Sequence, residues 1–267
     1  MKVRLGISRL GTALLPIFDY GVIRRAYCDY WAAALTKITN MQGKEVFVKE
    51  HACILTGPDV LFASVYDDDK KGLSPFLLAP GEKHTNPTYV PDDLLLAMQP
   101  IFQIRHPVLM FPSLLRAQLK VFSPCHPGDP RFVALLTLRY SRALYDWYVN
   151  NTDAMAPKVI DADDIMNDRS AVRQLCRETG LDADAVQYEW ETTEEKDFVM
   201  ATFKSTLNAS KGIKPGLEAR SLNIEEEKVK WAAEFGEKDA EDLAKFVYEA
   251  MPDYEYLLER RVRGDQK

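Results

Sequence analysis

Hydrophobic positions along this chain follow two different periods, and the period changes from one segment to the next. Steps of three and four residues predict helices, at 22–38, 93–98, from 107 to about 120, 131–150 and 169–179. Short, mostly apolar runs predict strands, at 45–51, 101–104 and 158–163. Strands separated by helices are typical of an α/β fold with a parallel sheet covered on both faces, in which ligands bind beyond the carboxyl ends of the strands.

Local signals refine several of these elements. Asp168 is placed to cap the helix that follows it, and Gly180 to end that helix. Pro112 is acceptable only in the first turn of its helix. The helix at 131–150 carries an apolar stripe that we expect to pack in the core: Tyr140, Leu144, Trp147 and Tyr148. Residues 56–92 contain several prolines and a charged run, which predicts a loop-rich insertion of the kind that forms lids or binding loops.

Composition narrows the class of protein. The chain has 267 residues, of which 46% are hydrophobic and 28% charged, so we predict one domain over 1–267 with a sizeable core and a helical C-terminal segment at 224–267. The net charge of −6 leaves no general basic surface for nucleic acid, so an anionic ligand would need a local basic site.

The cysteines and the apolar segments indicate which cellular compartment to expect for the protein. Four cysteines without a CxxC pair read as reduced thiols, and the isolated pair Cys125-His126 predicts no metal site. No stretch of 18 apolar residues and no clean signal peptide is found, so we expect a cytoplasmic protein that does not bind a membrane. The oligomeric state is left open.

The stretch Ile101-Phe-Gln-Ile-Arg105-His-Pro107, followed by Ser113, suggests an anion site. An apolar strand ends at a guanidinium, a proline starts a helix, and a hydroxyl follows eight positions after the arginine. Arginine offers a rigid fork of donors, and a helix N-terminus adds free N–H groups and a positive dipole end. The alternative is a surface arginine at a strand end followed by an ordinary helical serine.

A second motif, Lys49-Glu-His51, lies at the end of an earlier predicted strand. A neutral imidazole can take up a proton near pH 7, and a lysine supplies a compact cation where negative charge develops on oxygen. The alternatives are a solvated lysine and a hydrogen-bonded structural histidine.

In this order, the two motifs and the run Val159–Asp163 leading into a capped helix resemble the sulfotransferase family, and divergent fungal sulfotransferase-like proteins in particular. The resemblance covers roughly residues 22–215. It implies a P-loop NTPase-like fold, a three-layer sandwich around a parallel sheet.

The resemblance also implies a donor and a set of roles. The donor would be 3′-phosphoadenosine 5′-phosphosulfate (PAPS), and the acceptor a hydroxyl group of a small metabolite. Arg105 and Ser113 would hold the 3′-phosphate, His51 would remove the acceptor proton, and Lys49 would stabilise the transferred sulfuryl group. The pair Lys211-Gly212 resembles the segment that closes over the 3′-phosphate.

The N-terminus departs from the family pattern. A phosphosulfate-binding loop is expected after the first strand, and the candidate segment contains Arg9, Gly11 and Thr12. Leu10 stands where a hydroxyl is expected, and Pro16 would kink the helix that follows. Residues 1–7 alternate charged and apolar side chains, which is atypical of a central parallel strand. The loop is therefore degenerate or missing by this pattern.

Three functions remain open. The first is a sulfotransferase acting on a small hydroxylated metabolite. The second is a donor-independent enzyme on the same fold, catalysing a cyclisation, dehydration or isomerisation in a natural-product pathway. The third is a non-catalytic nucleotide-binding or scaffold protein.

Overall fold

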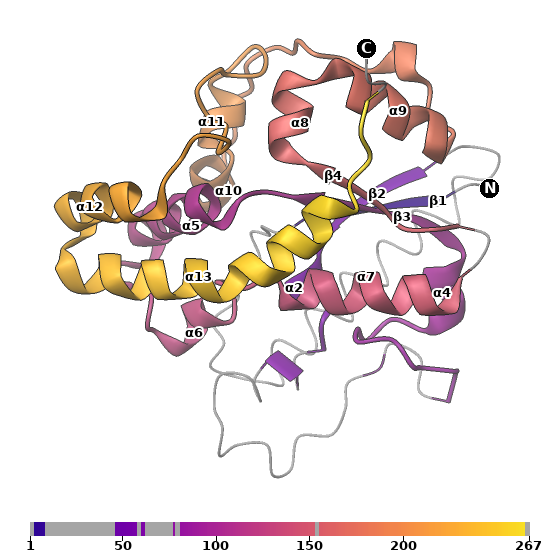
Figure 1. Ribbon diagram of the computed structural model, residues 1–267, viewed down its shortest axis with the longest axis horizontal. Helices are drawn as coiled ribbons and strands as arrows, with labels where there is room; N and C mark the ends of the chain where they lie inside the picture. Colours follow the sequence, from indigo (N-terminus) through magenta and orange to yellow (C-terminus); the bar gives the residue numbers. More distant parts are fainter. Residues whose placement is uncertain are drawn as a thin grey trace. The chain divides into compact units, whose positions relative to one another are not determined.

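The computed structural model describes residues 3–8, 46–57, 60–61, 77, 81–152 and 155–264. Its described strands are β1 (Val3–Ser8), β2 (Val46–His51), β3 (Met98–Ile104) and β4 (Lys158–Asp161). They form a sheet in the order β2-β1-β3-β4 (Figure 1). β1 pairs in parallel with both β2 and β3. The prediction of an α/β fold with a parallel sheet is therefore confirmed.

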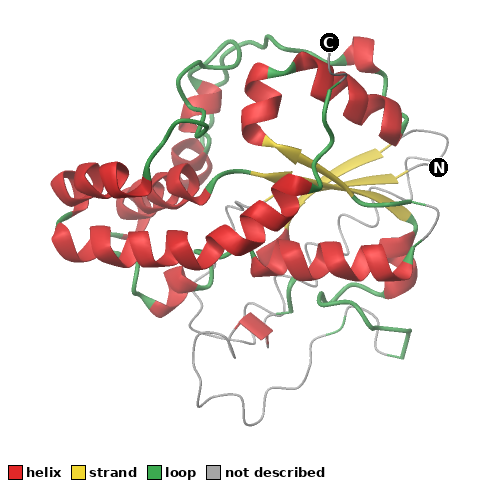
Figure 2. Cartoon of the chain, in the orientation of Figure 1, coloured by secondary structure: helices red, strands yellow, loops and turns green. Residues whose placement is uncertain are grey.

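Most of the described secondary structure is helical (Figure 2). The helices are α2 (Ala52–Leu55), α4 (Asp92–Leu96), α5 (Pro107–Phe122), α6 (Pro130–Val133), α7 (Arg139–Asn151), α8 (Ala162–Asn167), α9 (Arg169–Thr179), the 3₁₀ turn η1 (Ala183–Ala185), α10 (Phe198–Phe203), α11 (Ser205–Asn208), α12 (Ile224–Phe235) and α13 (Glu237–Glu259). The helix predicted at 22–38 and most of the insertion predicted at 56–92 lie outside the described residues. None of the helices in the described ranges combines the length and apolar character that crossing a bilayer requires.

The contacts divide the chain into two units. One consists of residues 1–102 and 138–157, and the other of residues 103–137 and 158–267. β3 contributes its first five residues to the former and its last two to the latter. One domain over 1–267 stays a prediction.

β1 is an inner strand, although the alternation of charged and apolar residues before Ser8 argued against that position. β1 lies between β2 and β3, with Ser8 opposite His51 and Ile7 opposite Phe102. Strand order depends on backbone pairing between segments far apart in the sequence, which side-chain alternation within one segment does not report.

The apolar stripe of α7 packs on β3 in the first unit. The ring of Phe102 meets Tyr145 and Tyr148 edge-on, at centroid distances of 5.5 and 6.4 Å. The Tyr148 hydroxyl donates to the Leu95 carbonyl oxygen at 3.0 Å. Of the predicted stripe, Leu144, Trp147 and Tyr148 are buried and Tyr140 is half-buried. Core packing of this stripe is confirmed.

The single helix predicted at 131–150 is wrong, because the chain forms two helices there. α6 ends at Val133 and α7 begins at Arg139. Between them, the N–H groups of Leu135 and Leu136 donate to carbonyls three residues earlier, so the chain tightens and leaves the helical path. Leu136 and Leu138 are buried, so this turn buries apolar side chains that a straight helix would place elsewhere.

The described end of the predicted insertion is held by Asp92. Its carboxylate accepts hydrogen bonds from the backbone and side chains of Thr85 and Asn86. Burial raises the pKa of Asp92, but these hydrogen bonds outweigh burial and leave the pKa below its ordinary value. The Trp147 indole donates to the Thr85 hydroxyl at 3.0 Å, which ties this loop to α7.

In the second unit, β4 is contacted by α8, α9 and α13. In Figure 1, α8 and α9 lie above β4 and α13 lies below it. The Asp168 carboxylate accepts from the N–H groups of Ser170 and Ala171 at the start of α9, and Gly180 ends that helix with a φ of 68°. Both predicted helix boundaries are confirmed, because a short carboxylate and a glycine at these positions satisfy the helix termini.

The C-terminal residues add to the edge of β4. The Val262 N–H donates to the Val159 carbonyl oxygen at 2.8 Å. A Cβ atom on Gly264 would lie 1.7 Å from the Ser170 hydroxyl and 2.8 Å from the Ala171 nitrogen. The tail therefore packs on the start of α9 at a distance that only glycine permits.

Replacing Gly264 with alanine is expected to lower the free energy of unfolding by about 1–3 kcal/mol, because the added methyl group overpacks this contact. Urea denaturation of both proteins measures the difference. Gly128→Ala is the matched control, since its Cβ would meet Asp242 at an ordinary 3.5 Å. Equal losses in the two variants would contradict a specific tail contact.

Candidate functional site

Arg105 lies directly after β3 and is half-buried. Its Nε atom is buried and has no hydrogen-bond partner. Burial lowers the pKa of this guanidinium below its ordinary value, while the nearby carboxylates of Asp163 and Asp161 oppose the shift. Arginine nevertheless keeps its proton in proteins. The position therefore offers a cation with an unused, preorganised donor, which is what binding an anion requires.

The N-terminus of α5 contributes its dipole to this position but no free N–H groups. The helix begins at Pro107, which has no N–H group. The imidazole Nδ1 of His106 accepts from the Val108 N–H at 3.1 Å, and the His106 carbonyl oxygen accepts from Leu109 and Met110. The expectation of free N–H groups here is wrong, because the capping histidine satisfies them. The positive end of the helix dipole remains.

Ser113 is exposed on the second turn of α5. At 1.5 Å per residue it lies about 9 Å along the helix axis from Pro107. Pro112 occupies the same turn, so its predicted place in the first turn is wrong, and the helix continues past it to Phe122. No hydrogen bond between described residues joins Ser113 to Arg105.

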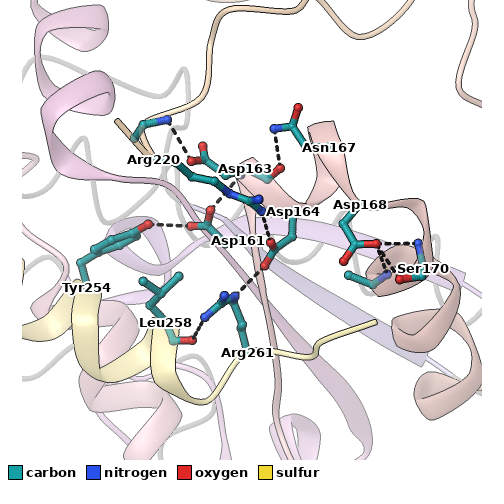
Figure 3. A network of polar contacts seen from close by, with 12 residues as sticks. Asp161, Asp163, Asp164, Asn167, Asp168, Ser170, Arg220, Tyr254, Leu258 and Arg261 are labelled. Atoms are coloured by element: carbon teal, nitrogen blue, oxygen red, sulfur yellow. Dashed lines mark hydrogen bonds and ion pairs between the residues drawn. The ribbon is translucent and has the colours of Figure 1, made fainter. Parts of the chain in front are cut away.

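Three buried aspartates lie at the end of β4 and in the first turn of α8, and we call them the β4 carboxylates: Asp161, Asp163 and Asp164 (Figure 3). Asp161 accepts through Oδ1 from the Asp163 N–H at 2.8 Å and through Oδ2 from the Tyr254 hydroxyl at 3.0 Å. Burial raises the pKa of Tyr254, so its hydroxyl stays protonated and can donate.

The other two β4 carboxylates bind segments that are distant in the sequence. Asp163 accepts through Oδ2 from the Ala219 N–H at 2.9 Å. Asp164 accepts from Arg220 through Oδ1 and from Arg261 through Oδ2, both at 2.7 Å. The three aspartates thus hold the loop at 219–220 and the end of α13 against β4.

The β4 carboxylates give stability a pH dependence. Burial raises the pKa of Asp161 from 3.8 to about 6, although hydrogen bonds from Asp163 and Tyr254 act in the opposite direction. A carboxyl whose pKa is higher in the folded protein contributes stability at pH values below its pKa in the unfolded chain. For Asp161 this contribution is lost as the pH rises through its folded pKa of about 6.

Asp161→Asn is therefore expected to gain stability relative to the wild type between pH 4 and pH 7, by up to about 3 kcal/mol. Urea denaturation at the two pH values measures this. Asp168→Asn should show the opposite trend, because hydrogen bonds from Ser170 lower the pKa of Asp168. A difference between wild type and Asp161→Asn that does not change with pH would contradict the burial of an ionised Asp161.

His51 is the last residue of β2 and is buried, with 8% of its surface exposed. It precedes α2, and its own N–H donates to the Glu50 carboxylate at 2.9 Å. Lys49 lies two residues earlier and is exposed. His51 is thus positioned at the carboxyl end of its strand, as predicted. Catalytic roles for both residues stay predictions.

Lys211 and Gly212 lie on a short backbone bridge in the second unit. Gly212 pairs with Glu189, and the Lys211 carbonyl oxygen accepts from the Trp190 N–H at 3.1 Å. The Lys211 side chain is 74% exposed and lies 3.9 Å from Glu191. A Cβ on Gly212 would meet the Tyr188 carbonyl oxygen at 3.1 Å, so the close approach favours glycine.

The remaining predicted site residues, Arg9, Gly11 and Thr12, lie outside the described residues. Across the described ranges, no group of three or more His, Cys, Asp or Glu side chains is arranged to hold a metal ion.

Sequence reasoning overlooked the β4 carboxylates. The available signal was a run of acidic residues directly after an apolar strand, at the edge where ligands bind in parallel sheets. The partners Tyr254 and Arg261 could not be found in this way, because they lie 93 and 97 positions from the carboxylates that they contact.

The chain is similar to two curated fungal proteins. It is 33% identical over 252 residues to sulfotransferase ppzF of Metarhizium rileyi (strain RCEF 4871), covering 85% of this chain and 73% of the relative. It is also 33% identical over 251 residues to sulfotransferase ppzF of Metarhizium majus (strain ARSEF 297), covering 84% and 72%. No family model matches the chain, and no solved structure matches it.

Proposed function

The chain belongs to the family of divergent fungal sulfotransferase-like proteins, and on this premise we propose that it transfers a sulfuryl group from PAPS to a hydroxyl group of a small metabolite. The observation that carries the proposal is Arg105, whose half-buried guanidinium keeps an unpartnered Nε directly after β3. The similarity to named sulfotransferases supports the reaction class, and the parallel sheet agrees with a three-layer, P-loop NTPase-like sandwich.

In the donor site, Arg105 binds the 3′-phosphate as a fork of charged donors. The dipole of α5 favours the same negative charge. Ser113 adds a hydroxyl from the second turn of α5, and the exposed Lys211 beside Gly212 closes over the phosphate when the nucleotide is bound. The segment containing Arg9, Gly11 and Thr12 follows β1 and holds the phosphosulfate.

In the transfer step, His51 takes the proton from the acceptor hydroxyl. The acceptor oxygen then forms a bond to sulfur as the bond between sulfur and the bridging phosphate oxygen breaks. The products are a sulfate ester and adenosine 3′,5′-bisphosphate. Lys49 stabilises negative charge on the sulfuryl oxygens. Ser8, which directly precedes this segment in the sequence, pairs with His51 between β1 and β2, and this pairing supports the proposal.

Isothermal titration of the wild-type protein tests the donor site. Adenosine 3′,5′-bisphosphate should bind at least about ten-fold more tightly than adenosine 5′-monophosphate, because only the bisphosphate has the 3′-phosphate that Arg105 would bind. Incubation with PAPS and a panel of phenols and alcohols should then yield sulfate esters. Binding without transfer would favour a non-catalytic nucleotide-binding protein. Absence of nucleotide binding would favour a donor-independent enzyme on this fold.

A further inference from the structure

Among the described residues of the second unit, three buried polar atoms lack hydrogen-bond partners. Two are donors, Nε of Arg105 and Nε2 of Gln118, and one is an acceptor, Oδ1 of Asp163. Asp163 is 5% exposed, and its other oxygen already accepts from the Ala219 N–H. An unmade hydrogen bond on a buried group costs free energy, so each of these atoms is expected to have a partner in the working protein.

The side chains of Arg105 and Asp163 interact electrostatically but do not contact each other directly. The Asp163 carboxylate favours the charged forms of both Arg105 and the adjacent His106. No hydrogen bond or ion pair joins Arg105 to Asp163. A ligand that satisfies both atoms must offer an acceptor to Arg105 and a donor to Asp163. An ionised phosphate oxygen accepts from a guanidinium but cannot donate to a carboxylate, whereas a hydroxyl can donate.

Among the three β4 carboxylates, only Asp163 has an oxygen without a hydrogen-bond partner. Both oxygens of Asp161 are used, by the Asp163 N–H and the Tyr254 hydroxyl. Both oxygens of Asp164 are used, by Arg220 and Arg261. A ligand donor that reaches this cluster therefore finds its acceptor on Asp163.

We infer that Asp163 accepts a hydrogen bond from the ribose 2′-hydroxyl of a nucleotide whose 3′-phosphate is bound by Arg105, so that the site selects ribonucleotides over 2′-deoxyribonucleotides. This inference rests on the proposed function. In adenosine 3′,5′-bisphosphate the 2′-hydroxyl is carried by the carbon next to the one bearing the 3′-phosphate. A phosphate oxygen on Arg105 thus brings a hydroxyl donor towards the free oxygen of Asp163.

The test compares two ligands on three proteins by isothermal titration. Wild type should bind adenosine 3′,5′-bisphosphate about ten-fold to a hundred-fold more tightly than 2′-deoxyadenosine 3′,5′-bisphosphate, because the deoxy analogue leaves a buried acceptor unpaired. Asp163→Asn should reduce this preference to about two-fold or less, since its amide oxygen can keep the Ala219 bond while its NH₂ group replaces the free acceptor. Asp164→Asn, the matched control on the same helix, should keep the wild-type preference.

The ratio of the two affinities is the readout, because the loss of one negative charge changes the binding of both ligands alike. Equal binding of the two ligands by wild type would overturn the inference and leave the donor site intact. A preference that persists in a folded Asp163→Asn protein would also overturn it, by assigning the hydroxyl to another residue. A wild type that binds neither ligand would remove the proposed function and this inference with it.

Discussion

His51→Ala is expected to lower kcat by about 10²–10⁴-fold, the usual contribution of a positioned general base. The imidazole ends β2 at the carboxyl edge of the sheet and is buried, so no solvent base replaces it directly. Steady-state assays of sulfuryl transfer, monitored through the release of adenosine 3′,5′-bisphosphate, measure the effect. The dissociation constant of the bisphosphate should change much less, because His51 acts on the acceptor.

His126→Ala is the matched control for His51→Ala. It also removes an imidazole. The His126 side chain is 60% exposed, and its Nδ1 is hydrogen-bonded to Oδ2 of Asp239 at 3.1 Å. We expect its kcat to equal that of the wild type. Wild-type turnover in a folded His51→Ala protein would remove His51 from the mechanism, and with it the transfer chemistry that the family similarity suggests.

Arg105→Ala is expected to weaken the binding of adenosine 3′,5′-bisphosphate by about 3 kcal/mol or more, because charge-assisted hydrogen bonds are worth about 1.5–3 kcal/mol each and the guanidinium can make two. Isothermal titration measures the loss. Arg105→Lys should recover only part of it, since lysine restores the charge without the planar fork.

Arg116→Ala is the matched control for the loss of one arginine charge. Arg116 lies on α5 and forms a surface pair with Glu234, so its removal should leave nucleotide binding near the wild-type value. The same variants also separate two enzyme classes. A donor-dependent sulfotransferase should lose turnover with Arg105→Ala, whereas a donor-independent enzyme should keep most of its activity.

Local chemistry in the sequence determined where many elements begin and end. Asp168 marks the start of α9 and Gly180 marks its end, because a short carboxylate satisfies the N-terminus of a helix and a glycine satisfies its C-terminus. His51 ends β2 and Arg105 directly follows β3, because each strand ends where charged or polar residues begin. These signals lie within a few residues of each other, so they can be read without the fold.

Only the tertiary structure decided the features that depend on distant segments. β1 became an inner strand through pairing with β2 and β3, despite its alternating pattern. The break between α6 and α7 follows from burying Leu136 and Leu138, which a helical period does not reveal. The partners of the β4 carboxylates come from the loop at 219–220 and from the end of α13. Such contacts form when folding closes long stretches of chain, so the free acceptor of Asp163 beside Arg105 became visible only in three dimensions.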